Sequence, residues 1–210
     1  MRRGVAAGVA CAVVVLAVAG CTGRDDPDMP GLTASPSATR TPTPTPSPSE
    51  SPTSIAGTVV DLSDPELGIV FEDVPDLSGD EADVYNWVGT YKVEYWRAMR
   101  TNTMSPAFAV FASPEAQAEI EGLVAENAAD GWVVEGVYRV AISDVAVTGD
   151  AATAMVCDDY TDVTVTDNDG PVTLEDAGVA TPLLLEVTLA RNPVAEGLWM
   201  VGNTSLVGSC

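Results

Sequence analysis

The chain has 210 residues, of which 46% are hydrophobic, and it carries 31 acidic residues against 9 basic ones. Its formal net charge is −22. Binding to phosphate groups or to anionic lipid needs clustered Lys and Arg, so we expect no nucleic-acid partner. The sequence contains no histidine, which removes the commonest general base and the commonest metal ligand.

Residues 1–20 have the layout of a secretory signal peptide. Arg2 and Arg3 provide a positive start, and a nearly unbroken apolar run follows from Val5 to Ala19. The alternative is a retained transmembrane anchor. A membrane span needs about 20 apolar residues, and this run is shorter, so export is the favoured interpretation.

The apolar run ends in Val18-Ala19-Gly20-Cys21, which resembles the bacterial lipobox. That resemblance implies cleavage before Cys21 and attachment of lipid to its thiol. We therefore expect an extracytoplasmic protein, anchored to the outer face of the cell membrane by the lipid on Cys21.

Residues 21–57 are rich in Pro, Ser and Thr, with Pro alternating with Thr or Ser from Thr41 to Pro52. Such a stretch has too little apolar surface to offset the entropy of folding, so we expect it to be disordered. Its prolines favour extended polyproline II, which makes a semi-stiff stalk between the anchor and the folded part. The alternative is disordered filler with no spacing role.

The folded part is expected from residue 58 onward, beginning with an extended lead-in over 58–79. Ser78-Gly79-Asp80-Glu81 is typical of a helix start, with Ser or Asp as the cap and acids in the first turn. Apolar residues then recur at helical spacing to about Thr101, with Lys92, Glu94 and Arg97 largely off the apolar face. Ser113-Pro114 opens a second helix that Asp130-Gly131 ends.

After Gly131 the pattern changes to alternating β-structure. Four strands separated by short turns or loops are expected over 132–148, 151–165, 181–192 and 197–208, which is typical of an antiparallel meander. Helices first and sheet second predict an α+β fold, with the helices packed on one face of a curved antiparallel sheet of four or more strands. The stretch 166–180, with Glu175 and Asp176, is expected to be a loop that could rim a pocket.

The order of these elements, the aromatic helix "YNWVGTYKVEYW", the hairpin "VAISDVAVTGDAATAMVCDD" and the closing "LWMV" strand resemble a known superfamily. It contains nuclear transport factor two, ketosteroid isomerase and the polyketide cyclases, and uncharacterised actinobacterial lipoproteins resemble this chain more closely still. The resemblance implies a cone-like domain over 80–210 with a pocket between the long helix and the sheet. This fold hosts enzymes and binding modules alike.

In such a pocket the resemblance places Tyr91, Tyr95 and Trp96, which could hold an apolar or sugar-like ligand. The alternative is that these rings are ordinary core. Isomerase-like chemistry would need a Tyr hydroxyl beside a carboxylate, which Tyr91 or Tyr95 with Asp158 or Asp159 could supply. Without a histidine or a recognisable catalytic motif, we expect a non-enzymatic protein and expect "CDDY" to present its acids to water.

Asp167 and Asp169 lie in "DNDG" and are weak candidates for a calcium site. The loop pattern is incomplete because Val165 stands where the first ligand should be, and Asn-Asp-Gly is ordinary turn chemistry. We therefore expect no metal site there, and no sequence motif suggests a cofactor.

The chain has four cysteines. Cys11 is lost with the signal peptide and Cys21 is taken by lipid, which leaves Cys157 and Cys210 in an exported domain. Such a pair predicts a disulfide. A free thiol or an intermolecular bridge is the alternative.

Three functions remain open from the sequence. The favoured one is a non-catalytic envelope lipoprotein that binds an unidentified small molecule or protein. The second is an extracytoplasmic cyclase- or isomerase-like enzyme. The third is an acidic, cation-binding spacer of the cell envelope.

Overall fold

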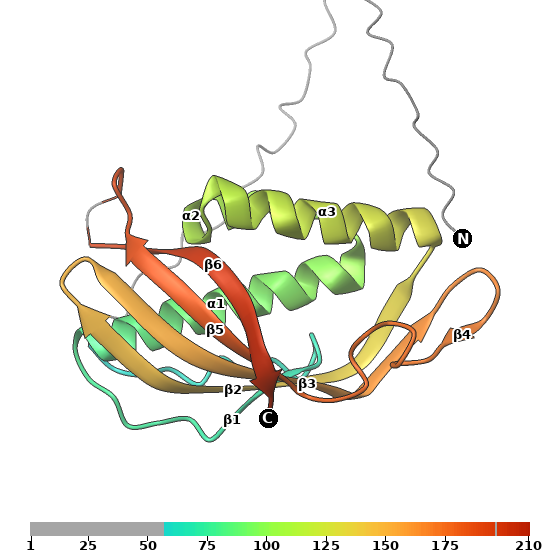
Figure 1. Cartoon of the computed structure of the whole chain (residues 1–210), viewed down its shortest axis with the longest axis horizontal. Helices are drawn as coiled ribbons and strands as arrows, with labels where there is room; N and C mark the ends of the chain where they lie inside the picture. The colour runs from blue at the N-terminus through green and yellow to red at the C-terminus, as the bar shows by residue number, and fades with distance from the viewer. Residues whose placement is uncertain (1–56, 196) are drawn as a thin grey trace, which may run out of the picture. The chain divides into compact units, whose positions relative to one another are not determined.

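The computed structural model describes residues 57–195 and 197–210. The predicted signal peptide over 1–20, Cys21 and nearly all of the predicted stalk lie outside the described residues. The described part is an α+β domain with three helices and a six-stranded sheet (Figure 1). The α+β class and the expected sheet of four or more strands are therefore confirmed.

The helices are α1 (Asp80–Thr101), α2 (Phe108–Phe111) and α3 (Pro114–Asp130). The strands are β1 (Ile69–Glu72), β2 (Val133–Thr148), β3 (Ala151–Thr166), β4 (Pro171–Val172), β5 (Leu183–Arg191) and β6 (Trp199–Ser209). The strand order is β1-β2-β3-β5-β6, and β4 pairs with β3. The short helix α2 was not expected from the sequence.

The ends of α3 follow from local sequence signals. The Ser113 side chain accepts a hydrogen bond from the Ala116 amide, and Pro114 occupies the first turn, where its missing amide proton costs nothing. Gly131 ends the helix at φ 70°, a left-handed conformation that glycine adopts without strain. The predicted start and end of this helix are confirmed.

The start of α1 differs from the expectation. Gly79 stands at the N-cap position at φ 62°, and no side chain caps the helix, so neither Ser78 nor Asp80 has the predicted capping role. Three acids in the first turn, Asp80, Glu81 and Asp83, still complement the positive end of the helix dipole. Lys92 was expected off the apolar face, and this was wrong because its side chain is buried.

The sheet is mixed rather than antiparallel throughout. β1 comes from the stretch expected as an extended lead-in, and it pairs in parallel with β2, with Ile69 opposite Tyr138. A parallel edge strand adds backbone hydrogen bonds that the meander alone cannot provide. The other pairings are antiparallel, as expected.

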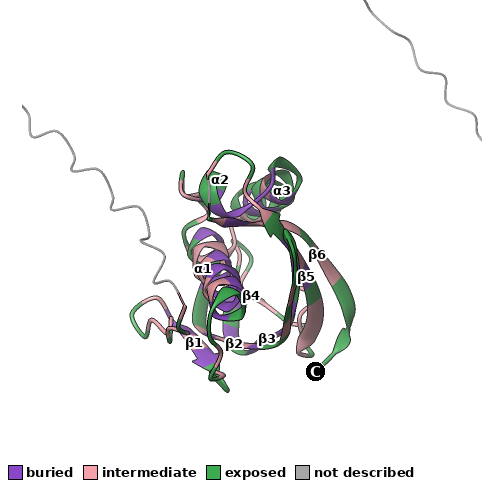
Figure 2. Ribbon diagram, turned by 90° about the vertical axis from the view of Figure 1, so that its left-hand side faces the viewer, coloured by how far each residue is buried: buried purple, intermediate pink, exposed green. Residues whose placement is uncertain are grey.

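The long strands β2 and β3 bend around α1. Their register shifts between Val137 and Arg139 and again between Ser143 and Ala146, and bulges of this kind increase local twist and curvature. Gly136 stands beside the first shift at φ 97°, where a side chain would meet the Asp162 carbonyl. Figure 2 shows the resulting sheet curving past α1, with buried residues on the side of α1 that faces it.

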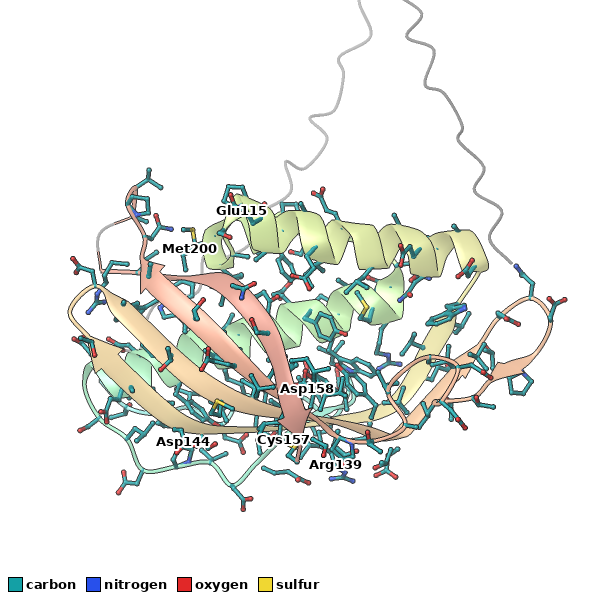
Figure 3. All side chains as sticks on the ribbon, viewed as in Figure 1. Glu115, Arg139, Asp144, Cys157, Asp158 and Met200 are labelled. Carbon is teal, nitrogen blue, oxygen red and sulfur yellow. A yellow bond between two sulfur atoms is a disulfide. The ribbon has the colours of Figure 1, made fainter. Side chains whose placement is uncertain are left out.

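A disulfide joins Cys157 of β3 to Cys210 at the end of the chain, with the two Cα atoms 6.0 Å apart. Cys157 and Asp158 are neighbours on β3 (Figure 3), so their side chains leave the strand on opposite faces. Cys157 is half-buried on the outer face, and Asp158 is buried on the inner face. The predicted disulfide is confirmed.

Candidate functional site

A cleft of about 170 Å³ lies between α1, α3, β2, β3 and the loop after β4. Helix α1 contributes Tyr95, Trp96 and Met99, because positions three or four apart share one helix face. The sheet contributes inward-facing residues of β2 and β3: Val134, Tyr160, Val163 and Val165. The cleft is therefore the space that the curved sheet leaves beside the C-terminal half of α1.

The loop between β4 and β5 closes one side of this cleft. Ala177 and Val179 line it, and they stand on a turn in which the Ala177 amide donates to the Thr173 carbonyl and the Val179 amide donates to the Leu174 carbonyl. Glu175 is exposed on the same turn. The stretch 166–180 was expected to be a loop that could rim a pocket; it contains the short strand β4, and its residues Ala177 and Val179 line the cleft.

Trp132 stands at the junction of α3 and β2 and also lines the cleft. Its amide donates to the Asn127 carbonyl at 2.9 Å, and its carbonyl accepts from the Asn102 side chain at 2.8 Å. These two bonds hold the backbone of Trp132 on both sides, directly after the left-handed turn at Gly131.

Behind the cleft lies a buried ion pair. Lys92 Nζ is 2.7 Å from Asp158 Oδ2, and the two side chains are only 4% and 2% exposed. The Tyr138 hydroxyl donates to Asp158 Oδ1 at 2.5 Å. Both carboxylate oxygens therefore have a partner, as the burial of a charged group requires.

Tyr160 connects this ion pair to the cleft. Its hydroxyl is 3.5 Å from Asp158 Oδ2 and 3.3 Å from the Tyr95 hydroxyl, and its ring stacks on Tyr138 with centroids 4.8 Å apart. Tyr95 and Tyr160 are both cleft residues. The cleft therefore has apolar walls and a pair of phenol hydroxyls that leads to a buried carboxylate.

Burial keeps these phenols protonated. Burial raises the pKa of Tyr95 to about 12, and the negative charges of Asp158 and Glu119 act in the same direction. Burial also raises the pKa values of Tyr138 and Tyr160 well above 10, with Asp158 adding to the effect. At neutral pH all three are neutral hydrogen-bonding groups rather than bases.

The structure brings together some of the residues that the sequence singled out. Tyr95 and Trp96 line the cleft, whereas Tyr91 is buried against Phe108, with ring centroids 5.5 Å apart, and does not line it. Tyr91 lies one turn before Tyr95 on the same face of α1, where it packs beside α2 and not at the cleft. Asp158 was expected to face water and instead lies behind the cleft, in the ion pair with Lys92.

Asp159 and the two candidate metal ligands have local roles. Asp159 accepts a hydrogen bond from the Thr161 amide. Asp167 accepts from the amides of Asp169 and Gly170, which is the turn chemistry expected for "DNDG". In the described part of the chain, no three acidic or cysteine side chains gather as metal ligands.

Lys92, Tyr138 and Tyr160 were missed by the sequence interpretation. One signal was present for Lys92, the only lysine of the chain, because it follows Val88 by four residues and precedes Trp96 by four. That spacing places it on the buried face. For Tyr138 and Tyr160 the inward-facing positions depend on the register shift between β2 and β3 at Val137 and Arg139, which local sequence does not show.

No protein-family model matches the sequence, and no curated protein matches it. A solved structure from Streptomyces avermitilis, described as a provisional dehydratase of the NTF2-like family, is 15% identical, with a TM-score of 0.35. The match covers 59% of this chain and 96% of that one.

Within residues 57–195 and 197–210, no helix is long and apolar enough to span a bilayer.

The similarity to the Streptomyces avermitilis structure is too distant to assign an activity. The site is therefore interpreted from its own geometry, as an apolar cleft backed by tyrosines and a buried ion pair.

Proposed function

We propose that this chain is an exported lipoprotein whose cone-like domain binds a small, mainly apolar ligand in the cleft beside α1. One observation carries the binding role. The cleft of about 170 Å³ has mainly apolar and aromatic walls, with Asn127 and two phenol hydroxyls as its polar groups. Ligand sites typically combine apolar walls with a few well-placed polar groups.

The size of the cleft limits the ligand. An engineered cavity of about 150 Å³ with apolar walls accommodates benzene, whereas drug-sized molecules need pockets of about 300 Å³ or more. The ligand, or the part of it that enters, is therefore about the size of one ring.

The arrangement favours binding over catalysis. Each carboxylate oxygen of Asp158 already accepts from Lys92 or Tyr138, and Asp158 does not line the cleft, so a ligand in the cleft does not contact it directly. The tyrosines are protonated at neutral pH and cannot act as bases. The cleft thus offers hydrogen bonds and apolar contact.

Phenol is a suitable probe because it combines one ring with one hydroxyl. We expect the full chain to bind it with a dissociation constant on the order of 1 mM, measured by titration calorimetry. Ala177→Leu fills the cleft from the loop and should weaken binding by about tenfold or more. The matched variant Ala180→Leu changes an exposed residue of the same loop and should leave the affinity unchanged. Equal affinities for the two variants, or no binding by the wild type, would contradict the proposal.

A catalytic role is a second candidate, favoured by one observation. Tyr160 lines the cleft while its hydroxyl lies 3.5 Å from Asp158 Oδ2, so a proton path from the cleft to a carboxylate exists. In that case Tyr160→Phe would abolish turnover of a substrate without preventing phenol from binding. If Tyr160→Phe lost phenol binding as well as turnover, the substitution would instead have disturbed the structure of the cleft.

The anchoring proposal rests on the resemblance of residues 18–21 to a lipobox. We expect Cys21→Ala to move the protein from the membrane fraction to the soluble fraction, because the lipid has lost its attachment thiol. Fractionation followed by intact mass measurement checks this. The wild-type mass should include a lipid on a chain that begins at Cys21, and a mature chain without lipid would overturn the proposal.

A further inference from the structure

We infer that the cleft selects ligands that carry a methylated ammonium group, with the cation held by aromatic faces. This inference deepens the proposed function and rests on it, because it names the chemical class that the same cleft would take. It follows from three features of the cleft: the nature of its walls, the sign of the surrounding charge and its size.

Four of the side chains that line the cleft are aromatic: Tyr95, Trp96, Trp132 and Tyr160. Each aromatic face carries a negative electrostatic potential that attracts an ammonium cation, with tryptophan the strongest of them. Met99 adds a polarizable sulfur to the same wall. Aliphatic walls would be enough to bind an alkane or a simple ring. The aromatic walls of this cleft can also bind a soft cation.

One aromatic wall already interacts with an ammonium group. Lys92 Nζ lies 5.6 Å from the centroid of the Tyr95 ring. Its charge is compensated by Asp158 at 2.7 Å, so the ion pair adds no net positive charge behind the cleft. No basic side chain lines the cleft itself among the described residues.

The surrounding charge is negative. Glu175 and Asp176 stand on the loop immediately before the lining residue Ala177. Glu119 of α3 is exposed and lies one turn before Leu123, which lines the cleft. The whole chain carries a net charge of −22, which attracts cations toward a cleft and repels anions.

The size of the cleft fits this ligand class. A volume of about 170 Å³ holds one compact head group and leaves the rest of a larger ligand outside. A methylated ammonium group sheds water more readily than a primary amine because its methyl groups cannot donate hydrogen bonds. Such a group can enter apolar walls without leaving unpaired donors behind.

The test compares choline with its neutral isostere 3,3-dimethyl-1-butanol, using the full chain at low ionic strength and without cationic detergent. The two probes have the same shape and differ only in the charge of the central atom. We expect choline to bind about 3- to 30-fold more tightly than the alcohol. Fluorescence can follow the titration, because Trp96 and Trp132 both line the cleft.

Two variants locate the effect. Trp132→Leu removes an aromatic face and should lower the wild-type preference for choline by about threefold or more. Glu175→Gln removes one rim charge and should weaken choline but not the alcohol, whereas Glu186→Gln, on the exposed side of β5, should change neither. Because Glu175 is exposed, its variant remains informative if Trp132→Leu fails to fold.

The outcomes separate this inference from the proposed function. Equal affinities for the two probes, or tighter binding of the alcohol, would overturn the selection of cations while phenol binding still supported the cleft as a ligand site. If phenol, choline and the alcohol all failed to bind, both proposals would fall. A choline preference that survives in Trp132→Leu and Glu175→Gln alike would also overturn the inference, because the cation would then be bound elsewhere.

Discussion

Replacing Asp158 with asparagine is expected to lower the free energy of unfolding by about 3–5 kcal/mol. The substitution preserves shape but leaves the Lys92 ammonium buried without a counter-charge, at a site where its side chain is 4% exposed. Since a domain of this size has a total stability of about 5–15 kcal/mol, this loss would be visible as a large shift in a urea unfolding curve at neutral pH.

A double variant separates the cost of an unpaired charge from the value of the pair itself. Lys92→Met with Asp158→Asn removes both charges and still leaves an amide oxygen to accept from Tyr138. We expect it to recover most of the stability lost in Asp158→Asn, because buried pairs that are replaced by neutral groups of similar volume cost little.

A matched surface pair provides the control. Arg139 Nη2 lies 2.9 Å from Asp162 Oδ2, but the two side chains are 34% and 57% exposed. Asp162→Asn should cost about 1 kcal/mol or less. If Asp158→Asn costs no more than Asp162→Asn, the ion pair behind the cleft does not have the structural role described above.

Replacing Cys210 with serine is expected to destabilise the oxidised domain by up to about 4 kcal/mol. The disulfide joins residues 53 positions apart, and closing a loop of that length restricts the unfolded chain. It also ties the end of β6 to β3 across β5, which lies between them in the sheet. Thermal melts of the wild type and Cys210→Ser under oxidising conditions measure the difference.

The control for the disulfide is the same pair of melts in a reducing agent. Both chains then lack the cross-link, so their melting temperatures should converge. Cys157→Ser should match Cys210→Ser in the oxidised state. A wild type that melts at the same temperature as Cys210→Ser in both conditions would contradict a stabilising role for the disulfide.

Local signals in the sequence predicted the parts of the fold that depend on neighbouring residues. Ser113, Pro114 and Gly131 predicted the ends of α3, and alternating apolar residues predicted β2 and β3. Gly79 shows the limit of this reasoning, because α1 begins without the side-chain cap that Ser78 or Asp80 could have supplied. First-turn acids and tertiary packing stabilise that end instead.

Long-range pairing was not predictable in the same way. The parallel contact of β1 with β2 joins Ile69 to Tyr138, and no short motif in either segment signals it. The ion pair joins Lys92 to Asp158 across 66 positions. Its formation depends on the helix face and on the β3 register together. This is why Asp158 was expected at the surface and was found behind the cleft.

The central claim, that the cleft beside α1 is a ligand site, is tested most directly by nuclear magnetic resonance during a phenol titration. The chain has four tryptophans, and Trp96 and Trp132 line the cleft, whereas Trp87 and Trp199 are buried elsewhere. The indole signals of Trp96 and Trp132 are predicted to shift progressively and to saturate, while those of Trp87 and Trp199 stay in place. Indole signals that do not move, or that move equally for all four tryptophans, would contradict the claim.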